Sequence, residues 1–244
     1  MIIPVLSSKG GVGKTTIATN LAYTLSKKAK TVLIDTDPQN GVASVLCKRH
    51  DIGLADILLE GTNYGETLRQ VRENFFIIPT GAKAIENEFS FNESFKYENI
   101  QNLCLKLESE GGFEFILFDT PPGYTVQSNV LMKLADVILA VFEAEPASYA
   151  SFKVFETHMF TKEKEIREKL WLIINKVRAS EISEDFSFIF RYEAGGNILA
   201  YLPYDEAVSV ASGECLLVEE YKPDSPFVKL MYELVEKLLT LLKK

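Results

Sequence analysis

Cysteine and histidine are scarce in this sequence, with three cysteines and two histidines among 244 residues. Cys47, Cys104 and Cys215 are far apart, and none stands in a CxxC motif or a histidine-rich context. Because a zinc or iron–sulfur site needs clustered ligands, this pattern argues against metal chemistry of that kind. We expect three unpaired cysteines, buried as small apolar side chains in a reducing cytosol.

Long apolar runs, repeats and low-complexity stretches are also missing. No run approaches the roughly 18 to 20 apolar residues that a membrane span needs. The first seven residues lack the basic and long apolar regions of a signal peptide. Apolar residues make up 47% and charged residues 25%, which excludes a disordered chain, a collagen-like chain and a disulfide scaffold. We expect a cytoplasmic protein that forms a single domain over residues 1–244.

Positive charge is in deficit, because 26 lysines and arginines face 34 aspartates and glutamates, a net charge of −8. Such a balance argues against a protein whose whole surface attracts nucleic acid. It leaves room for a local basic patch on one face of the molecule.

Short apolar runs alternate with amphipathic helical patterns along the chain. The predicted strands are Ile2–Leu6, Thr31–Ile34, Phe75–Ile78, Phe115–Phe118, Val137–Phe142, Leu170–Ile174 and Ile198–Leu202. The predicted helices are Thr15–Lys28, Tyr97–Glu110, Ser128–Leu134, Ala147–Lys164 and Pro226–Leu242. Uninterrupted apolar strands fit a sheet buried on both faces, and their alternation with helices indicates right-handed crossovers between parallel strands. The expected fold is α/β, a doubly wound, mostly parallel sheet with helices on both faces.

The segment Ser8–Thr16 reads SKGGVGKTT and lies between the first predicted strand and the first predicted helix. That context is typical of a P-loop, in which glycines let backbone N–H groups converge on phosphate oxygens at a helix N-terminus. Lys14 would neutralise the β- and γ-phosphates, and the Thr15 hydroxyl would bind Mg²⁺. The residues that we assign to nucleotide binding here are Lys9, Gly10, Gly11, Val12, Gly13, Lys14, Thr15 and Thr16. A glycine turn that merely joins strand and helix is the alternative.

The loop departs from the standard G-x-x-x-x-G-K-[ST] pattern in two places: Ser8 stands where glycine is usual, and an additional lysine, Lys9, opens the loop. With these features the segment resembles the deviant Walker A motif of the ParA/MinD/Soj ATPase superfamily. The resemblance implies ATP and Mg²⁺ as cofactors. It also implies a homodimer that forms on ATP binding, in which Lys9 reaches the phosphates held by the partner subunit. A Lys9 that points into solvent within a monomer is the alternative.

Two aspartates follow the second predicted strand in the segment Ile34–Gln39, which reads IDTDPQ. Their spacing of two places both on one side of an extended strand, at the edge where open α/β sheets bind ligands. The segment looks like the family's Asp-x-Asp-Pro-Gln switch motif. The resemblance assigns Asp37 to positioning the attacking water and Asp35 to supporting the Mg²⁺ shell. An ordinary Asp-Pro turn is the alternative.

The predicted strand Phe115–Phe118 ends in Asp119, followed by TPPG. An apolar strand that delivers a carboxylate to the metal is the Walker B form, and the whole segment is similar to the family's Asp-x-Pro-Pro-Gly. With this motif the expected site is complete in outline. The expected catalytic residues are Lys9, Lys14 and Asp37, and the expected metal-binding residues are Thr15, Asp35, Asp37 and Asp119.

The adenine base is harder to assign. Asn175 follows another predicted strand and resembles the family's asparagine that hydrogen-bonds adenine, for which a side-chain amide offers both a donor and an acceptor. Pro203 and Asp205 resemble the loop that closes over the base. Ordinary turns at the ends of strands are the alternative in both places.

The resemblance covers nearly the whole chain and is nearest to the small Soj/ParA-like members. It implies a slow Mg²⁺-dependent ATPase that a ParB-like partner protein activates and that partitions or positions DNA. A MinD-like or BcsQ-like ATPase that positions a membrane or surface complex is the alternative, with membrane binding less expected than DNA binding. Eight cations, matched by eight nearby acids, offer a candidate DNA patch. These cations are Lys153, Lys162, Lys164, Arg167, Lys169, Lys176, Arg178 and Arg191.

The C-terminal pattern Phe227–Leu242 fits a helix docked on the sheet better than a membrane-binding helix, because acids dilute its basic character. Three rival protein classes fit the sequence less well. A P-loop enzyme such as dethiobiotin synthetase would need a small-molecule pocket that the sequence does not reveal. A protein like the nitrogenase iron protein would need cluster-binding cysteines that are missing. A nucleotide-binding module without turnover is disfavoured by Lys14, Asp37 and Asp119 together.

Overall fold

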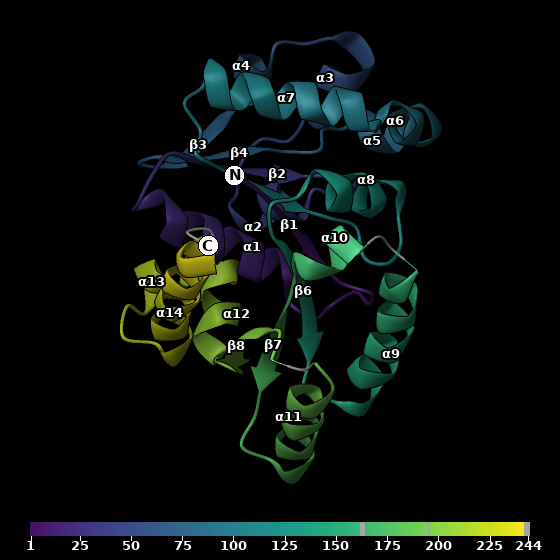
Figure 1. Ribbon diagram of the computed structural model, residues 1–244. Coiled ribbons are helices and arrows are strands. Elements are labelled where there is room, and N and C mark those ends of the chain that lie inside the picture. The colour runs from purple at the N-terminus through teal and green to yellow at the C-terminus, as the bar shows by residue number, and fades with distance from the viewer. Residues whose placement is uncertain (162–163, 195, 242–244) are drawn as a thin grey trace.

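The computed structural model describes residues 1–161, 164–194 and 196–241 of the chain (Figure 1). At its centre is an eight-stranded sheet in the order β3-β4-β2-β5-β1-β6-β7-β8. The strands are β1 Ile2–Leu6, β2 Thr31–Asp35, β3 Arg69–Arg72, β4 Phe75–Ile78, β5 Phe115–Asp119, β6 Ile138–Glu143, β7 Leu170–Val177 and β8 Ile198–Pro203. β3 pairs antiparallel with β4, and all other neighbours in the sheet are parallel. The expected fold class is confirmed.

Helices cover both faces of this sheet (Figure 1). They are α1 Lys14–Ser26, α2 Gly41–Val45, α3 Leu54–Glu60, α4 Tyr64–Thr67, α5 Lys83–Glu86, α6 Glu88–Ser94, α7 Tyr97–Ser109, α8 Val126–Leu134, α9 Pro146–Phe160, α10 Lys164–Glu168, α11 Glu181–Glu193, α12 Glu206–Gly213, α13 Val218–Tyr221 and α14 Pro226–Leu241. Successive side chains of a strand point to opposite faces, so β2 sends Leu33 to one core and Val32 and Ile34 to the other.

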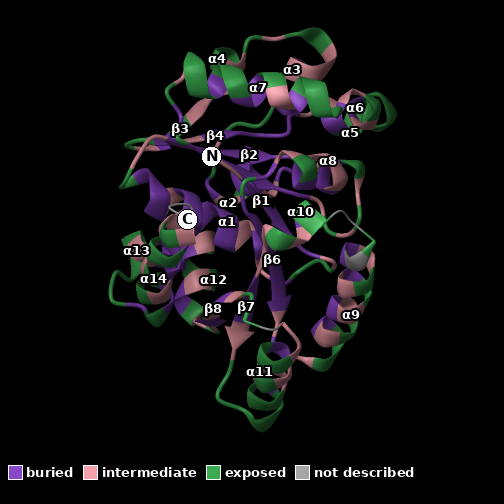
Figure 2. Cartoon of the chain, in the orientation of Figure 1, coloured by how far each residue is buried: buried purple, intermediate pink, exposed green. Residues whose placement is uncertain are grey.

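Three groups of buried side chains follow from this alternation, and they form the purple interior of Figure 2. One face of the sheet packs against α1, α2 and α12–α14. The opposite face packs against α3 and α6–α8 near β2 and β5, and against α9–α11 near β6 and β7. Because both faces are covered, the strands carry the uninterrupted apolar runs from which they were predicted.

The C-terminal helix α14 is docked on the sheet, as expected. Phe227, Met231, Leu234 and Leu238 are at most 2% exposed and belong to the core that contains β1 and α1. The side chain of Lys237 reaches back to donate to the carbonyl oxygen of Leu199 at 3.1 Å. Residues 242–244, the last part of the predicted helix and its two terminal lysines, lie outside the described residues. Within the described chain, every helix is too short or too polar to cross a bilayer.

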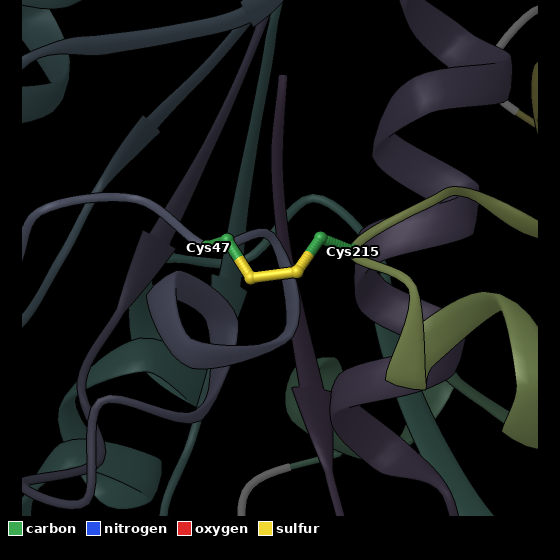
Figure 3. Close-up of a disulfide and its surroundings, with 2 residues drawn as sticks. All are labelled: Cys47 and Cys215. Carbon is green, nitrogen blue, oxygen red and sulfur yellow. A yellow bond between two sulfur atoms is a disulfide. The ribbon is translucent and has the colours of Figure 1, made fainter.

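The cysteines differ from expectation in one respect. Cys47 and Cys215 form a disulfide bond (Figure 3), so the prediction of three unpaired cysteines is wrong for this pair. Cys104 is unpaired and buried, as predicted. The two bonded residues are 168 positions apart in the sequence, and they meet because the turn after α2 packs against the turn after α12. No local spacing signals such a pair.

Element boundaries differ where polar residues interrupt or extend a pattern. The helix predicted over 147–164 ends at Phe160 as α9, and α10 begins at Lys164; residues 162–163 lie outside the described part of the chain. β7 continues to Val177, past the apolar run that predicted it. The edge strand Arg69–Arg72 (RQVR) carries three polar residues out of four, so hydrophobic periodicity could not find it.

Candidate functional site

The carboxyl ends of β1, β2 and β5 meet at one edge of the sheet. β1 leads into the glycine-rich loop, β2 ends at Asp35 and β5 ends at Asp119. Asp35 and Asp119 are register partners across β2 and β5, and Asp119 is also the register partner of Val5 in β1. Three motifs that are far apart in the sequence therefore share one crevice, at the place where open α/β sheets bind ligands.

The glycine-rich loop curls over the start of α1. Gly11 (φ 81°) and Gly13 (φ 90°) adopt left-handed backbone conformations, which glycine adopts without strain. A Cβ atom on Gly13 would lie 2.3 Å from Nδ2 of Asn175, so close packing also requires glycine there. Because α1 begins at Lys14, the unpaired N–H groups of its first turn lie at the loop.

A hollow of 340 Å³ opens in front of this loop. It is lined by Ser7, Gly10, Gly11, Gly13, Lys14, Thr15, Thr16, Asp37 and Pro122. The structure thus brings Asp37 to the loop, as the sequence predicted. Val12 is buried beneath the loop and Lys9 is exposed outside the hollow, so these two predicted residues do not line it.

Two side chains of the loop bind Asp119. Nζ of Lys14 lies 2.6 Å from Oδ1 of Asp119, and the Thr15 hydroxyl donates to Oδ2 at 2.6 Å. The side chains of Lys14 and Asp119 are only 8% and 1% exposed. Because little water reaches them, each charge is stabilised mainly by the opposite charge of its partner. Burial raises the pKa of Asp119, although Lys14 and Thr15 act in the opposite direction. A triphosphate that entered the hollow would offer Lys14 another anion.

Asp35 holds the segment that carries Asp37. Its Oδ1 accepts from the backbone N–H of Asp37 at 2.9 Å, and its Oδ2 accepts from the N–H of Val42 at 3.0 Å. Burial, and next the negative charge of Asp119, raise the pKa of Asp35 to about 8. The carboxylate of Asp37 lies closer to solvent, where it accepts from the N–H of Gln39 at 3.0 Å. Of the two aspartates, Asp37 is the one with free access to a bound molecule in the hollow.

The donor set at this edge fits Mg²⁺. Hydroxyl and carboxylate oxygens are the ligands that a hard cation prefers, and Thr15 Oγ1 and Asp119 Oδ2 already lie 2.6 Å apart. Within the described residues, no group of three or more acidic, histidine or cysteine side chains could hold a metal by itself. Magnesium at nucleotide sites is held by one or two protein groups together with phosphates and water. The assignment of Thr15, Asp35, Asp37 and Asp119 to metal binding therefore stays a prediction that the chemistry of these groups supports.

Two glutamates at the end of β6 hold lysines beside the loop. Nζ of Lys9 lies 3.1 Å from Oε1 of Glu145, and both side chains are exposed, by 46% and 39%. Nζ of Lys176 lies 2.5 Å from Oε1 of Glu143 and donates to the carbonyl oxygen of Gly11 at 2.6 Å. Sequence reasoning missed both glutamates. Their position at the carboxyl end of a parallel strand was the signal that could have found them.

The predicted base-binding residues fall into two groups. Asn175 is buried next to the loop, where its Nδ2 donates to the carbonyl oxygen of Val12 at 2.8 Å. Pro203 and Asp205 instead line a separate hollow of 550 Å³ at the end of β8. Asp205 caps α12 by accepting from the N–H of Ala207, and it also accepts from the Ser225 hydroxyl at 2.6 Å. The structure brings Asn175 to the loop and leaves the role of Pro203 and Asp205 a prediction.

Ser7 is a further residue that sequence reasoning did not single out. Its side chain is 3% exposed and lines the hollow in front of the loop. Its Oγ has no hydrogen-bond partner within the described part of the chain. A buried hydroxyl is costly without a partner, so Ser7 is a ready donor or acceptor for a molecule bound in the hollow.

Comparison with known proteins agrees with this geometry. The family model AAA_31, described as an AAA domain, matches residues 1–172. A ParA family protein of Mycoplasma genitalium is 31% identical over 194 residues, which cover 72% of this chain and 71% of the relative.

Two solved structures share the fold. A putative plasmid partition protein of Borrelia burgdorferi B31 bound to AMPPNP matches with a TM-score of 0.75 and 21% identity, covering 98% of both chains. The septum site-determining protein MinD of Pyrococcus horikoshii OT3, complexed with Mg-ADP, matches with a TM-score of 0.79 and 24% identity, covering 99% of this chain and 96% of MinD. Because the family model matches more than half of the chain and a ParA family protein is 31% identical over more than two thirds of both chains, this chain belongs to the AAA domain family of that model and to the ParA/MinD superfamily of P-loop ATPases.

Proposed function

We propose that this chain is a Mg²⁺-dependent ATPase of the ParA/Soj type that hydrolyses ATP slowly on its own. ATP binding joins two copies into a homodimer, and an activating partner protein of the ParB-like kind stimulates hydrolysis and separates them. This cycle partitions or positions DNA in the cytoplasm, where the dimer associates with the nucleoid. The observation that carries the proposal is the contrast between two lysines of one loop: Lys14 is buried against Asp119, and Lys9 is exposed against Glu145.

The contrast matters because the two lysines differ in how firmly they are held. Lys14 lines the hollow in front of the glycine-rich loop of its own chain, which we call the phosphate hollow, so it binds the nucleotide held there. Lys9 is held by an exposed ion pair, and such pairs contribute only about 0 to 1 kcal/mol. Lys9 can therefore leave Glu145 at little cost and bind the phosphates of a second subunit. A phosphate–lysine contact between subunits makes dimerisation depend on the nucleotide.

The dimer is tested by measuring molar mass with multi-angle light scattering in the presence of Mg²⁺ and a non-hydrolysable ATP analogue. We expect the wild type to dimerise and Lys9→Ala to stay monomeric while it still binds the analogue. Lys28→Ala is the matched control, because the Lys28 side chain is as exposed as that of Lys9 (47% against 46%) and also pairs with an exposed glutamate, Glu236. Dimerisation of Lys9→Ala with wild-type affinity would refute the contact between subunits.

DNA is the cargo that we propose, bound by the dimer rather than the monomer. Within one chain, several of the candidate cations already have acidic partners: Lys153 with Glu156 and Glu193, Lys164 with Glu168, and Lys176 with Glu143. Lys162 lies outside the described residues. Such pairing leaves one chain with a weak basic surface, so DNA binding needs the cations of two subunits together.

The cargo is tested by sedimenting the chain with DNA or with anionic liposomes, with ATP analogue and with ADP. We expect DNA binding in the ATP-analogue state only, weakening steeply as salt is added. Liposome binding without DNA binding would favour the MinD-like or BcsQ-like alternative, in which the chain positions a membrane or surface complex. The buried apolar face of α14 argues against that alternative, because a docked helix has no apolar face to offer a bilayer.

A further inference from the structure

The disulfide between Cys47 and Cys215 joins the turn after α2 to the turn after α12 (Figure 3). Cys47 follows α2, and α2 follows directly on the segment of Asp37. At the start of α2, the N–H of Val42 donates to Asp35, and a Cβ atom on Gly41 would lie 3.6 Å from Oγ1 and Cγ2 of Thr15. The position of the first cysteine is thus tied to the carboxylate and hydroxyl groups of the phosphate hollow through a short helix.

The other end of the bond belongs to the segment that follows α12. Cys215 lies two residues beyond the end of this helix, whose N-cap is Asp205. Soon after Cys215, the N–H of Val218 donates to Oδ1 of Asn20 in α1 at 3.0 Å. The bond therefore fastens the Asp37 segment to the C-terminal segments packed against α1. The segment that it restrains on the Asp37 side, residues 38–53, contains the five-residue helix α2 and otherwise consists of turns, bends and irregular chain.

The two sulfur atoms differ in their surroundings. Cys47 is exposed, and Cys215 is only partly so. Cys47 lines a shallow surface hollow of 560 Å³ together with Lys48, Arg49, His50, Asp51 and Ala82. Cations beside a cysteine stabilise its thiolate, which is the reactive form in thiol–disulfide exchange. An open, net basic hollow lined by an exposed cysteine is the setting of a reactive cysteine rather than of a sealed structural bond.

We propose that Cys47 and Cys215 form a thiol–disulfide exchange site for a dithiol reductant, entered at Cys47, and that reduction there releases the segment of residues 38–53. The expected effect of this release on ATP binding rests on the proposed ATPase function. The thiol–disulfide exchange does not depend on that function. The ligand is a dithiol whose thiolate can enter the basic hollow. The dithiol stays bound only briefly, because the exchange releases it from the protein as a separate molecule.

The exchange is balanced in two steps. A thiolate of the reductant attacks Sγ of Cys47, the bond between the cysteines breaks, and Cys215 leaves as a thiolate that takes up a proton. The second thiolate of the reductant then attacks its own sulfur in the mixed disulfide, and Cys47 leaves as a thiolate. Two electrons pass from the dithiol, which becomes a disulfide, to the protein, which gains two thiols. Oxidation runs the same steps in reverse, with the Cys47 thiolate attacking an oxidised carrier.

The exchange is tested on the full folded chain equilibrated with mixtures of reduced and oxidised dithiothreitol, then alkylated at neutral pH with excess N-ethylmaleimide and mapped by mass spectrometry. We expect Cys47 and Cys215 to change together with the dithiol ratio. Cys104 is the internal control, because its buried side chain should stay unlabelled in the folded protein at every ratio. In Cys215→Ser, oxidised glutathione should label Cys47, whereas Cys215 in Cys47→Ser should react at least about fivefold more slowly because it is less exposed. Any of three results would overturn the proposal. These are free thiols at Cys47 and Cys215 in the air-equilibrated protein, a disulfide that stays oxidised in every dithiothreitol mixture, and equal labelling rates in the two single variants.

The release is tested by limited proteolysis and by the dissociation of a fluorescent ATP analogue from oxidised and reduced protein. We expect reduction to open cleavage within residues 38–53 and to speed dissociation at least about fivefold, the lower end of typical coupling between sites. The double variant Cys47→Ser/Cys215→Ser should match the reduced protein and ignore dithiol. Equal rates of cleavage within residues 38–53 in the oxidised and reduced protein would overturn the proposed release. If the analogue binds neither form, the proposed ATPase function fails, while the thiol mapping and the proteolysis still decide the exchange site.

Discussion

Lys9 and Glu145 join the start of the glycine-rich loop to the start of α9, with Nζ and Oε1 3.1 Å apart. Glu145 is the N-cap residue of α9, so the contact joins the glycine-rich loop to the N-terminus of the helix that follows β6. The other end of α9 also meets the site: the ring of His158 lies 4.1 Å from that of Tyr124, which follows the Pro121–Gly123 turn after β5. α9 thus contacts both the residue that opens the glycine-rich loop and the segment that follows β5.

Removing the partner of Lys9 should favour the dimer. In Glu145→Gln the lysine no longer has to leave an ion pair before it binds the phosphates of a second subunit. Exposed pairs contribute about 0 to 1 kcal/mol each and the dimer breaks two of them, so we expect dimerisation in ATP analogue to become up to about thirtyfold tighter. Glu236→Gln is the matched control, because it breaks the exposed pair with Lys28. Dimer affinity is measured by analytical ultracentrifugation, and weaker dimerisation of Glu145→Gln would show that Glu145 supports the dimer instead.

Lys14→Ala should act on both nucleotide binding and stability. Loss of a charged hydrogen bond to phosphate should weaken ATP binding at least about tenfold, measured by isothermal titration calorimetry. The same change leaves the carboxylate of Asp119 buried without its cation, which should lower the free energy of unfolding of the nucleotide-free protein by about 3 kcal/mol. In the double variant Lys14→Ala/Asp119→Asn the stability should recover in part while ATP binding stays weak. Unchanged ATP affinity in Lys14→Ala would contradict the assignment of the loop.

Asp37→Ala should separate binding from hydrolysis. Asp37 lines the phosphate hollow with its carboxylate near solvent, where it can orient a water molecule. Loss of a residue that positions the attacking water typically costs about 10²- to 10⁴-fold in rate. We therefore expect ATP binding to persist, phosphate release to fall at least about 100-fold, and the ATP dimer to become long-lived. Single-turnover phosphate release and light scattering measure the two effects, and undiminished hydrolysis would remove this role from Asp37.

The sheet and the phosphate loop could be predicted because their signals are local. Strands covered on both faces carry uninterrupted apolar runs, so β1 and β4 were placed with their observed ends. The glycines of the loop are needed for the backbone at Gly11 and for close packing at Gly13, and both requirements leave a visible pattern. The carboxylates at the ends of β2 and β5 followed from the same rule of parallel sheets.

The rest depends on contacts between distant segments, which leave no local pattern. The Cys47–Cys215 bond exists because two turns meet across the molecule, and neither turn has a distinctive sequence. Glu145 stands near Lys9 because β1 and β6 are neighbours in the sheet, a fact that only the strand order reveals. The hydrogen bond between Ser225 and Asp205 could not be predicted from the sequence either. The Ser225 hydroxyl reaches Asp205 only because α14, which follows Ser225, packs nearby.

Asp205 should stabilise the fold through its charged form, and this makes a prediction about pH. Burial alone would raise the pKa of Asp205, but hydrogen bonds from the Ser225 hydroxyl and the N–H of Ala207 keep it below its ordinary value of 3.8. Because the pKa in the folded state is lower than in the unfolded state, this stabilisation is present above pH 3.8 and is lost as the pH falls through the folded value. Asp205→Ala should therefore cost about 1 kcal/mol at neutral pH, the usual contribution of a helix N-cap.

The same cost should shrink in acid, because protonation removes from the wild type what the substitution has removed from the variant. Urea unfolding of both proteins from neutral pH down to about pH 3 measures this difference. Asp205→Asn is the control: its side chain still accepts from the N–H of Ala207 but cannot ionise, so it should lose less than the alanine variant at neutral pH and show little change with pH. If the alanine variant lost the same stability in acid as at neutral pH, the cap would be acting through the shape of the side chain rather than its charge. The pKa of Asp205 in the folded protein would then equal its unfolded value, contrary to the lowering expected from the hydrogen bonds at the start of α12.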